Sequence, residues 1–442
     1  MKRQELQATL SLGSIFAFRM MGLFMIYPVF ALYAQALPHA TPTLIGMALG
    51  IYGLTQAILQ VPFGMLSDKI GRKPIIVTGL VLFAIGSVIA ALSHQLPGII
   101  VGRALQGCGA IGSTIMAAVA DNTHEDNRIK AMAMIGMIIA LSFIAAMGLG
   151  PILNTWIGIP GIFGFTAILA MIGIIVLFLF VPTTSHHGLH RDTEVDSGQI
   201  STLLANKELL RLDLGIFILH AVLTATFIAV PMMLLHAGLI ASRTWTIYVP
   251  VLVIAFLLMI PFIGYAEAKQ KLRLIFIAAI VVLSCAQFFL LFFQYSIWMM
   301  SVILTLFFTA FIILEASLPS LIAKIAPSGK KGTAMGMYST AQFLGIFAGG
   351  GLGGMVYHLA STNGVLLFSG ILGLTWLLAA WHMADFQYLS TKVFDLSRFS
   401  ERDPVKLREQ LLQEPGVKEV SVYPDEDTVY LKVDRKLFKE KG

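Results

Sequence analysis

Long apolar stretches separated by short polar segments fill the first 385 residues of the chain. Each stretch holds about twenty mostly apolar residues, the length that a helix needs to cross the hydrocarbon core of a bilayer. The pattern predicts twelve membrane-spanning helices, at 9–35, 43–66, 75–94, 97–120, 131–153, 161–182, 212–235, 243–266, 274–293, 297–323, 333–356 and 364–385. The first stretch follows only "MKRQELQA" and has no cleavage site, so we interpret it as a retained span and not as a signal peptide.

A polar segment divides the predicted spans into two sets of six. The predicted organisation is a first six-helix half at 1–182, a cytoplasmic linker at 183–207, a second half at 208–386 and a separate tail domain at 387–442. After the eighth span, "GYAEAKQKLRLI" weakly repeats the small, acidic and basic order of "GMLSDKIGRKPII", which follows the second span. Two six-helix halves of this kind are typical of a transporter that arose by duplication.

The tail follows a different pattern. Alternating residues predict strands at "STKVFDL", "VKEVSVY" and "TVYLKV", and Asp403, Pro404 and Gly416 delimit a helix between the first two. With a further helix beginning at "RKLFKEKG", this order resembles a small α+β ferredoxin-like domain of the metal-associated type, cut short before its closing helix and strand. The Cys-x-x-Cys pair that binds metal in that type is missing. We therefore expect a cytoplasmic regulatory or interaction domain with an unidentified protein or ligand partner.

Composition supports a membrane protein and argues against an enzyme. Only 12% of the 442 residues are charged and the mean hydropathy is +0.83, whereas soluble domains carry about 25% charged residues. Both cysteines, Cys108 and Cys285, fall within predicted spans, so neither a disulfide framework nor a Cys-rich metal site is expected. We recognise no nucleophile paired with a base, no metal-ligand set and no phosphate-binding loop, and therefore expect no cofactor.

The distribution of Lys and Arg predicts the orientation, because short loops rich in these residues stay in the cytoplasm. The N-terminus, the linker and the loops on the same side hold 16 of the 30 Lys and Arg residues, and the tail holds 11. The opposite loops hold only Arg243, and Arg19 and Arg103 lie inside spans. Both termini are thus expected in the cytoplasm, and the basic pI follows from this topology without a nucleic-acid partner.

Two motifs resemble those of a known family. "GMLSDKIGRKP" (64–74) resembles the motif between the second and third helices of the major facilitator superfamily, and "RALQGCGA" (103–110) resembles the fourth-helix motif of its drug:proton antiporters. The resemblance covers 1–385 and is closer still at "GIYGLTQAILQVPFGMLSDKIGRKP", at "LEASLPSLIAK" and in the tail domain. It implies an all-α integral membrane protein of twelve helices in two halves. The fifth span matches the antiporter motif at Gly150 and Pro151 but not after them, which weakens antiport relative to symport.

The loop motif suggests a conformational latch. A small residue in the second helix permits close helix approach, and a glycine in the loop permits a tight turn. In the family, the carboxylate that matches Asp68 lies against the N-terminus of the eleventh helix, which here starts near Gly332, and Arg72 would bridge it to Asp121. The alternative is a plain positive-inside topology signal. The implied latch residues are Gly64, Asp68, Gly71, Arg72, Lys73 and Asp121.

Ionisable residues inside the predicted spans are candidates for proton coupling and substrate binding, because each charge there costs at least ~2.5 kcal/mol. Arg19 and Arg103 lie in the first and fourth spans, and Gln106 belongs to the same motif as Arg103. Glu315 lies too deep in the tenth span to reach an interface, so it is expected to bind a proton near neutral pH. His220, in the seventh span, could share that proton or be a satisfied core group.

These features predict a proton-coupled secondary transporter that exports a small amphipathic or drug-like solute by alternating access. The alternatives are a proton-coupled symporter for uptake, and a membrane sensor whose tail domain reports ligand binding. The expected partners are a small-molecule substrate, protons and the lipid bilayer, with no nucleic acid. We expect a monomer in the bacterial cytoplasmic (inner) membrane.

Overall fold

The computed structural model describes residues 1–182, 200–327, 330–383, 389–399, 401, 403–424 and 428–434. Most of the predicted linker and the predicted terminal helix at "RKLFKEKG" lie outside these residues. The elements are α1 Arg3–Phe24, α2 Tyr27–Gln35, α3 Pro42–Ile70, α4 Arg72–Leu92, α5 Leu96–Cys108, α6 Gly112–Asp121, α7 Glu125–Phe180, α8 Ile200–Leu204, α9 Lys207–His236, η2 Ala241–Arg243, α10 Trp245–Ala268, α11 Leu272–Phe293, α12 Ile297–Ile325, α13 Lys331–Trp381, β1 Leu389–Asp395, η3 Leu396–Arg398, α14 Pro404–Leu412, β2 Val417–Tyr423 and β3 Thr428–Asp434.

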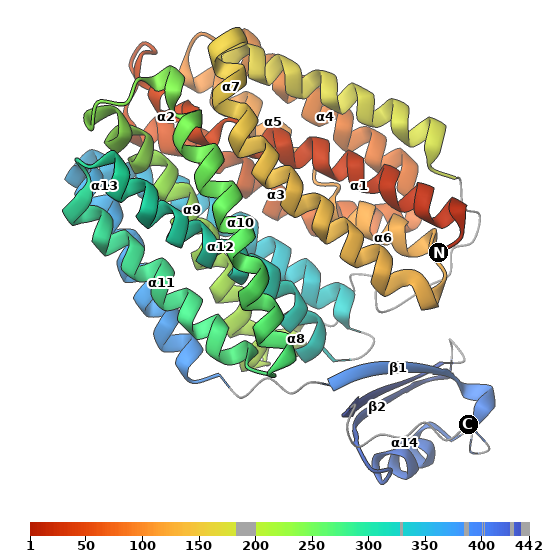
Figure 1. Ribbon diagram of the computed structural model, residues 1–442. Coiled ribbons are helices and arrows are strands. Elements are labelled where there is room, and N and C mark those ends of the chain that lie inside the picture. Colours follow the sequence, from red (N-terminus) through yellow and green to blue (C-terminus); the bar gives the residue numbers. More distant parts are fainter. Residues whose placement is uncertain are drawn as a thin grey trace.

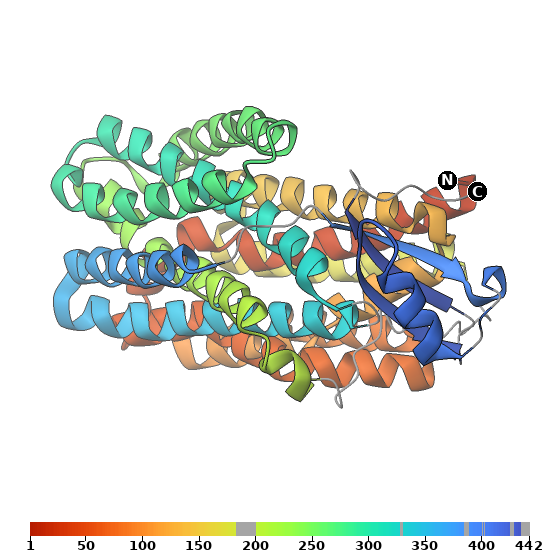
Figure 2. The same cartoon turned by 90° about the horizontal axis from the view of Figure 1, so that it is seen from below.

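The long helices form one elongated bundle, with the small β-sheet domain at one end of it (Figures 1 and 2). Ten helical segments among the described residues are long and apolar enough to cross a membrane. Two of them, Lys130–Phe180 and Lys331–Trp381, are 51 residues long and turn back on themselves, at Gly158 and at Ala360–Ser361. Counted as two crossings each, they account for the twelve predicted spans. The predicted loops at these two places are reduced to single turns.

Two other predicted spans are interrupted. The first is divided into α1 and α2 at Met25 and Ile26, where Pro28 follows as the second residue of α2. Proline lacks an N–H and crowds the carbonyl four residues earlier, so it favours a break there. The fourth span is divided into α5 and α6 at residues 109–111, inside the "RALQGCGA" motif. The sequence pattern predicted both spans but neither interruption.

Glycines bring helices of the two halves into close contact. On α3, a Cβ at Gly46 would overlap the carbonyl oxygen of Gly350 on α13, and one at Gly50 would lie 2.8 Å from the carbonyl oxygen of Phe347. One turn further along, a Cβ at Gly53 would overlap the carbonyl oxygen of Phe343. Only residues without a side chain allow two helix backbones to approach this closely. These contacts lie along the first part of α3, toward the end of the bundle remote from the N-terminus.

The tail forms its own small domain. Its sheet has the order β1–β3–β2 with both pairs antiparallel, and eight buried residues make a core separate from that of the bundle, namely Leu396, Leu407, Leu411, Val417, Val420, Val429, Leu431 and Val433. The three predicted strands and the helix between the first two are thus found. The proposed boundary at 386/387 falls between α13 and β1, outside the described residues, and stays a prediction.

Lys432 of the tail contacts the bundle. Because side chains alternate along a strand, Lys432 lies on the opposite face of β3 from the core residues Leu431 and Val433. Its Nζ donates to the carbonyl oxygens of Ala326 (2.6 Å) and Ile325 (3.3 Å) at the C-terminus of α12, and lies 3.1 Å from Oε2 of Glu419. A positive charge is favourable at this end of a helix. The side chain is 4% exposed, so the contact is a buried one.

Truncation of the chain after residue 388 tests the independence of the two cores. We expect the bundle to insert and remain folded, because the contact of Lys432 is worth only about 1–3 kcal/mol. The melting temperature of the purified truncated protein should fall by a few degrees, and Lys432→Met in the full chain should cause a similar fall. A truncated protein that aggregates or fails to insert would show that the tail is part of the bundle's fold.

The glycine contacts predict a position-dependent effect of one added methyl group. Gly46→Ala places a Cβ against the Gly350 carbonyl, and overpacking of this kind costs about 1–3 kcal/mol. Gly351→Ala is the matched control, because a Cβ there meets no heavy atom within 4 Å. Melting temperatures of the two purified variants should therefore differ, with Gly46→Ala the lower. Equal values would mean that α3 and α13 do not need this close approach.

Candidate functional site

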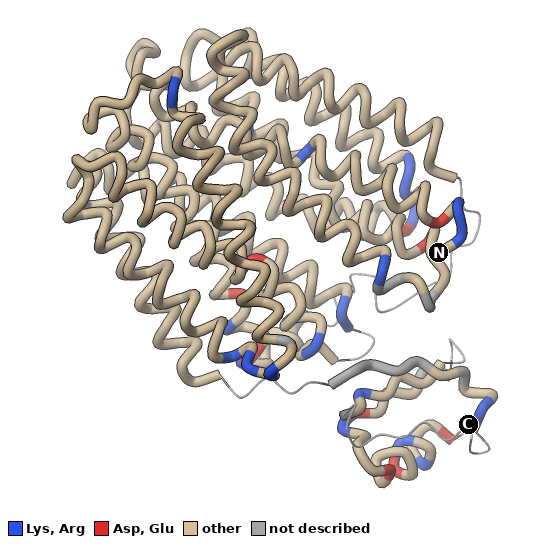
Figure 3. The backbone as a smooth tube through the Cα atoms, viewed as in Figure 1, with Lys and Arg blue, Asp and Glu red and all other residues tan. Residues whose placement is uncertain are grey.

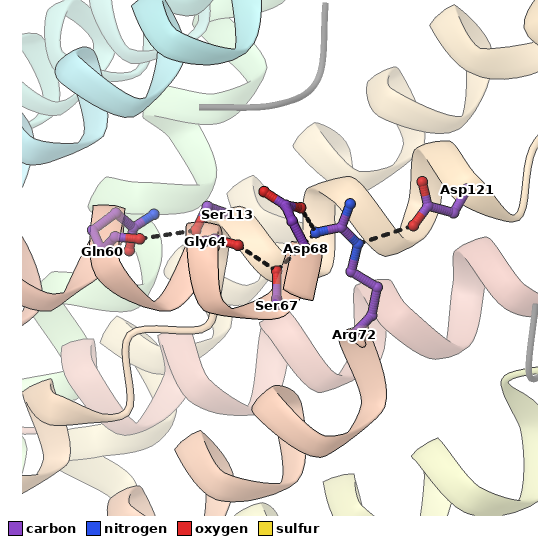
Figure 4. A network of polar contacts seen from close by, with 7 residues as sticks. All are labelled: Gln60, Gly64, Ser67, Asp68, Arg72, Ser113 and Asp121. Carbon is purple, nitrogen blue, oxygen red and sulfur yellow. Dashed lines mark hydrogen bonds and ion pairs between the residues drawn. The ribbon is translucent and has the colours of Figure 1, made fainter. Parts of the chain in front are cut away.

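The predicted latch residues meet where α3 ends and α4 begins. Gly71 joins these helices with φ of 97°, a conformation that favours glycine, and it directs Arg72 back along α3 (Figure 4). Arg72 Nε donates to Oδ2 of Asp121 on α6 (2.9 Å), and Nη1 donates to Ser67 Oγ (2.8 Å) and to Oδ1 of Asp68. The three charged side chains are only 11–27% exposed. One guanidinium thus holds two carboxylates from two helices.

The other two latch candidates lie beside this cluster. The carbonyl oxygen of Gly64 accepts from Ser67 Oγ (2.7 Å), and a Cβ at Gly64 would lie 3.1 Å from Oγ of Ser113 on α6. Lys73 is in the first turn of α4. The ion pair of Asp68 is with Arg72, which belongs to the same half of the chain. The latch function of these residues stays a prediction.

A second polar group lies deep in the first half. Arg19 on α1 and Arg103 on α5 are 1% and 0% exposed, and their guanidinium carbons lie 5.8 and 5.0 Å from the centre of the Tyr52 ring on α3. Arg19 donates to the side-chain oxygen of Gln56. Arg103 donates to Oε1 of Gln106 (2.8 Å) and to the carbonyl oxygen of Ala48 (3.3 Å). The structure therefore brings Arg19 and Arg103 to one tyrosine and joins Gln106 to Arg103.

Neutral side chains support these arginines. Gln106, which accepts from Arg103, donates to Ser87 Oγ (2.7 Å), and this oxygen also accepts from Thr166 Oγ1 (3.1 Å). Gln56 donates to Oε1 of Gln60 (2.9 Å), one turn further along α3. Tyr52, Gln56 and Gln60 are spaced four residues apart and so lie on one face of the helix. This row was not predicted from the sequence, although its regular spacing in an apolar span would have indicated it.

The third polar group lies in the second half and contains the two remaining candidates. Gln342 on α13 donates through Nε2 to Oε1 of Glu315 on α12 (3.1 Å), and lies 3.0 Å from Nε2 of His220 on α9. His220 Nε2 and Glu315 Oε2 are 3.8 Å apart. The His220 side chain is buried, whereas that of Glu315 is 34% exposed. Three helices thus hold one carboxyl and one imidazole around an amide that the sequence analysis did not single out.

Two further ionisable groups lie near this cluster. Asp213 is buried on α9, seven residues before His220, and Tyr338 is buried on α13, one turn before Gln342. Tyr338 interacts electrostatically with both Asp213 and Glu315. The sequence analysis placed Asp213 at the very start of its span and did not count it, but its spacing from His220 puts the two on one helix face. Titratable groups therefore continue from Glu315 toward the start of α9.

Charged residues elsewhere gather at one end of the bundle. Figure 3 shows Lys and Arg concentrated near the end that carries the N-terminus and the tail domain. Large apolar side chains, such as Phe178, Leu378 and Trp298, are exposed on the outside of the helices. Soluble domains rarely expose so many large apolar side chains, whereas a lipid environment favours them on the outside of the helices.

Comparison with known proteins agrees with this architecture. The chain is 45% identical to the inner membrane transport protein YajR of Escherichia coli K12, over 98% of this chain and 95% of that protein. It is 37% identical to the uncharacterized transporter BU466 of Buchnera aphidicola, over 78% of this chain and 89% of its relative. The family profile of the YajR YAM domain matches residues 400–439, so the tail is a domain of this type.

Solved structures show the same fold. The crystal structure of nucleoside transporter NupG (D323A mutant) matches with a TM-score of 0.65 at 14% identity, covering 86% of this chain and 99% of that one. The human organic anion transporter MFSD10 matches with a TM-score of 0.61 at 18% identity, covering 85% and 99%. The profile of the Major Facilitator Superfamily matches residues 12–350 and 251–415. The chain belongs to the Major Facilitator Superfamily, a family of transporters and not of enzymes.

Proposed function

We propose that this protein is a proton-coupled secondary transporter of the bacterial inner membrane that exports a small amphipathic solute by alternating access, with both termini in the cytoplasm. The observation that carries the proposal is the cluster of Glu315, Gln342 and His220 deep among apolar helices. A carboxyl this deep in the bundle that faces few fixed charges can exist with or without its proton, which is the property that coupling requires. The inner membrane is the location named for the relative from E. coli.

The position of Glu315 supports its use as a proton carrier. It lies ten residues before the end of α12 at Ile325, or about 15 Å along the helix, so its carboxyl cannot reach an interface. The titratable groups that face it are His220, Tyr338 and, further along α9, Asp213. We propose that Asp213 and Tyr338 connect Glu315 to the cytoplasm and that Gln342 orients the carboxyl in each protonation state.

Contacts between the halves support an inward-facing state. The halves meet closely where Gly46, Gly50 and Gly53 on α3 pack on α13, at the end remote from the termini. At the other end of α3, the recorded partners of Asp68 and Gly64 belong to the first half. We propose that the outward-facing state brings Asp68 against the positive N-terminal end of α13, and that Arg72 and Asp121 hold it ready for that contact.

The latch is tested by Asp68→Asn. The substitution removes a charge from the bond to Arg72 and from the proposed contact with α13, and such charge-assisted bonds are worth about 1.5–3 kcal/mol. We expect transport to fall by about tenfold or more while expression and insertion stay normal. Glu208→Gln is the control, because it neutralises another ion pair, that with Arg211, at the start of α9. Normal transport by Asp68→Asn would show that the latch is not needed.

Coupling is tested by Glu315→Gln, which mimics the protonated carboxyl at nearly the same volume. Substrate binding should survive, but transport into inverted vesicles should lose its dependence on pH over about two units around 6.5, the usual value for histidine. The control variant Glu208→Gln should show the same pH dependence of transport as the wild type. A variant that retains the wild-type pH profile would remove Glu315 from the mechanism and leave His220 as the candidate.

A further inference from the structure

The two arginines of the first half are buried without a counter-ion. Arg19 and Arg103 are at most 1% exposed, and neither forms an ion pair with a carboxylate of the described residues. Their recorded partners are two amide oxygens, one backbone carbonyl oxygen and the face of Tyr52. All of these are neutral, so two positive charges lie close together in an apolar region.

Both guanidinium groups also keep unused donors. Nε and Nη1 of Arg19 and Nη2 of Arg103 are buried and have no hydrogen-bond partner among the described residues. A buried N–H of a charged group is costly to leave unpaired, and a buried charge is normally paired. Packing on Tyr52 offsets part of this cost. The remaining cost is explained if an anionic group completes the site during the transport cycle.

The site lies where the two halves meet. Tyr52, which contacts both arginines, has its ring centre 6.3 Å from that of Phe343 on α13. Near Arg103, the ring of Tyr27 lies 5.7 Å from that of Phe227 on α9. Aromatic side chains of the second half thus pack on the tyrosines that lie near the arginines. A ligand held here would contact positive charge on one side and apolar rings on the other.

We propose that Arg19 and Arg103 bind the anionic group of the transported solute, which is therefore an amphipathic organic anion with a carboxylate or similar oxyanion and an apolar body. Guanidinium groups suit this ligand because their planar donors match two oxygens at once. The inference rests on the proposed transport function and names its substrate class. The row of Gln56 and Gln60 continues from Arg19 along α3 toward Ser113 and Gly64, so occupancy of the site has a physical route to the latch.

Binding to the purified full chain in detergent tests the site without a proton gradient. The probes are naphthalene-2-carboxylate, naphthalene-2-sulfonate and the neutral naphthalene-2-carboxamide, which share one apolar body. Thermal-shift titration should show binding of the two anions, with the carboxamide at least tenfold weaker. This comparison uses the wild-type protein and does not depend on whether a variant folds.

Variants then assign the anion preference to the arginines. Arg19→Gln and Arg103→Gln should each weaken anion binding by at least tenfold and reduce the preference over the carboxamide, whereas Arg103→Lys should retain part of it. Arg243→Gln is the control, because Arg243 is exposed in η2, in the connection between α9 and α10, and its substitution should leave all three affinities unchanged. The proposal is overturned if neither anion binds, if the carboxamide binds equally well, or if the glutamine variants keep the preference.

The outcome can be separated from that of the proposed function. If anion binding depends on the arginines but transport does not depend on the proton gradient, the proposed proton coupling is wrong and the proposed anion site stands. If transport is proton-coupled but binding shows no preference for anions, the proposed anion site is wrong and the proposed coupling stands.

Discussion

A charged side chain in the interior of the bundle has little access to water, and this constraint determines which groups surround the interior charges. In hydrocarbon, polar groups have to be satisfied by other parts of the protein. The chain meets the constraint in two ways. In the second half, the carboxyl of Glu315 and the imidazole of His220 share the side-chain amide of Gln342. In the first half, Arg19 and Arg103 use neutral oxygens and a tyrosine face. One half thus carries a removable charge and the other a permanent one.

Close packing at glycines determines how the two halves meet. Helices α3 and α13 approach closely at glycines, and α13 also packs on α9, where Cβ atoms at Gly345 and Gly349 would overlap the carbonyl oxygens of Phe217 and Ala221. Helix α13 is therefore in backbone contact with both halves, and it also carries Gln342 of the Glu315 cluster. In the proposed mechanism, a change in the protonation of Glu315 on α12 would reach the surface between the halves through Gln342 on this helix.

Much of the fold could be predicted from the sequence, because hydrophobic length alone specifies membrane spans. The tail strands followed from alternation, and Gly71 from the need for a tight turn with positive φ. The breaks at Met25–Ile26 and at 109–111 were not predicted, because uninterrupted apolar composition hides a local change of backbone direction. In the candidate site, the charged residues stood out from their surroundings. The neutral partner Gln342 did not, since only the fold brings it to a charge.

The contact of Lys432 gives the tail domain a thermodynamic link to the transport cycle. The end of α12 cannot move relative to the tail without breaking two hydrogen bonds to a buried ammonium group, unless the whole domain moves with it. If the contact differs between the two access states, anything that binds the tail and alters β3 changes the ratio of those states. Linkage is reciprocal, so a transported solute that favours one state changes the tail's affinity for its own partner by the same factor. The tail domain would then respond to binding of the solute as well as regulate its transport.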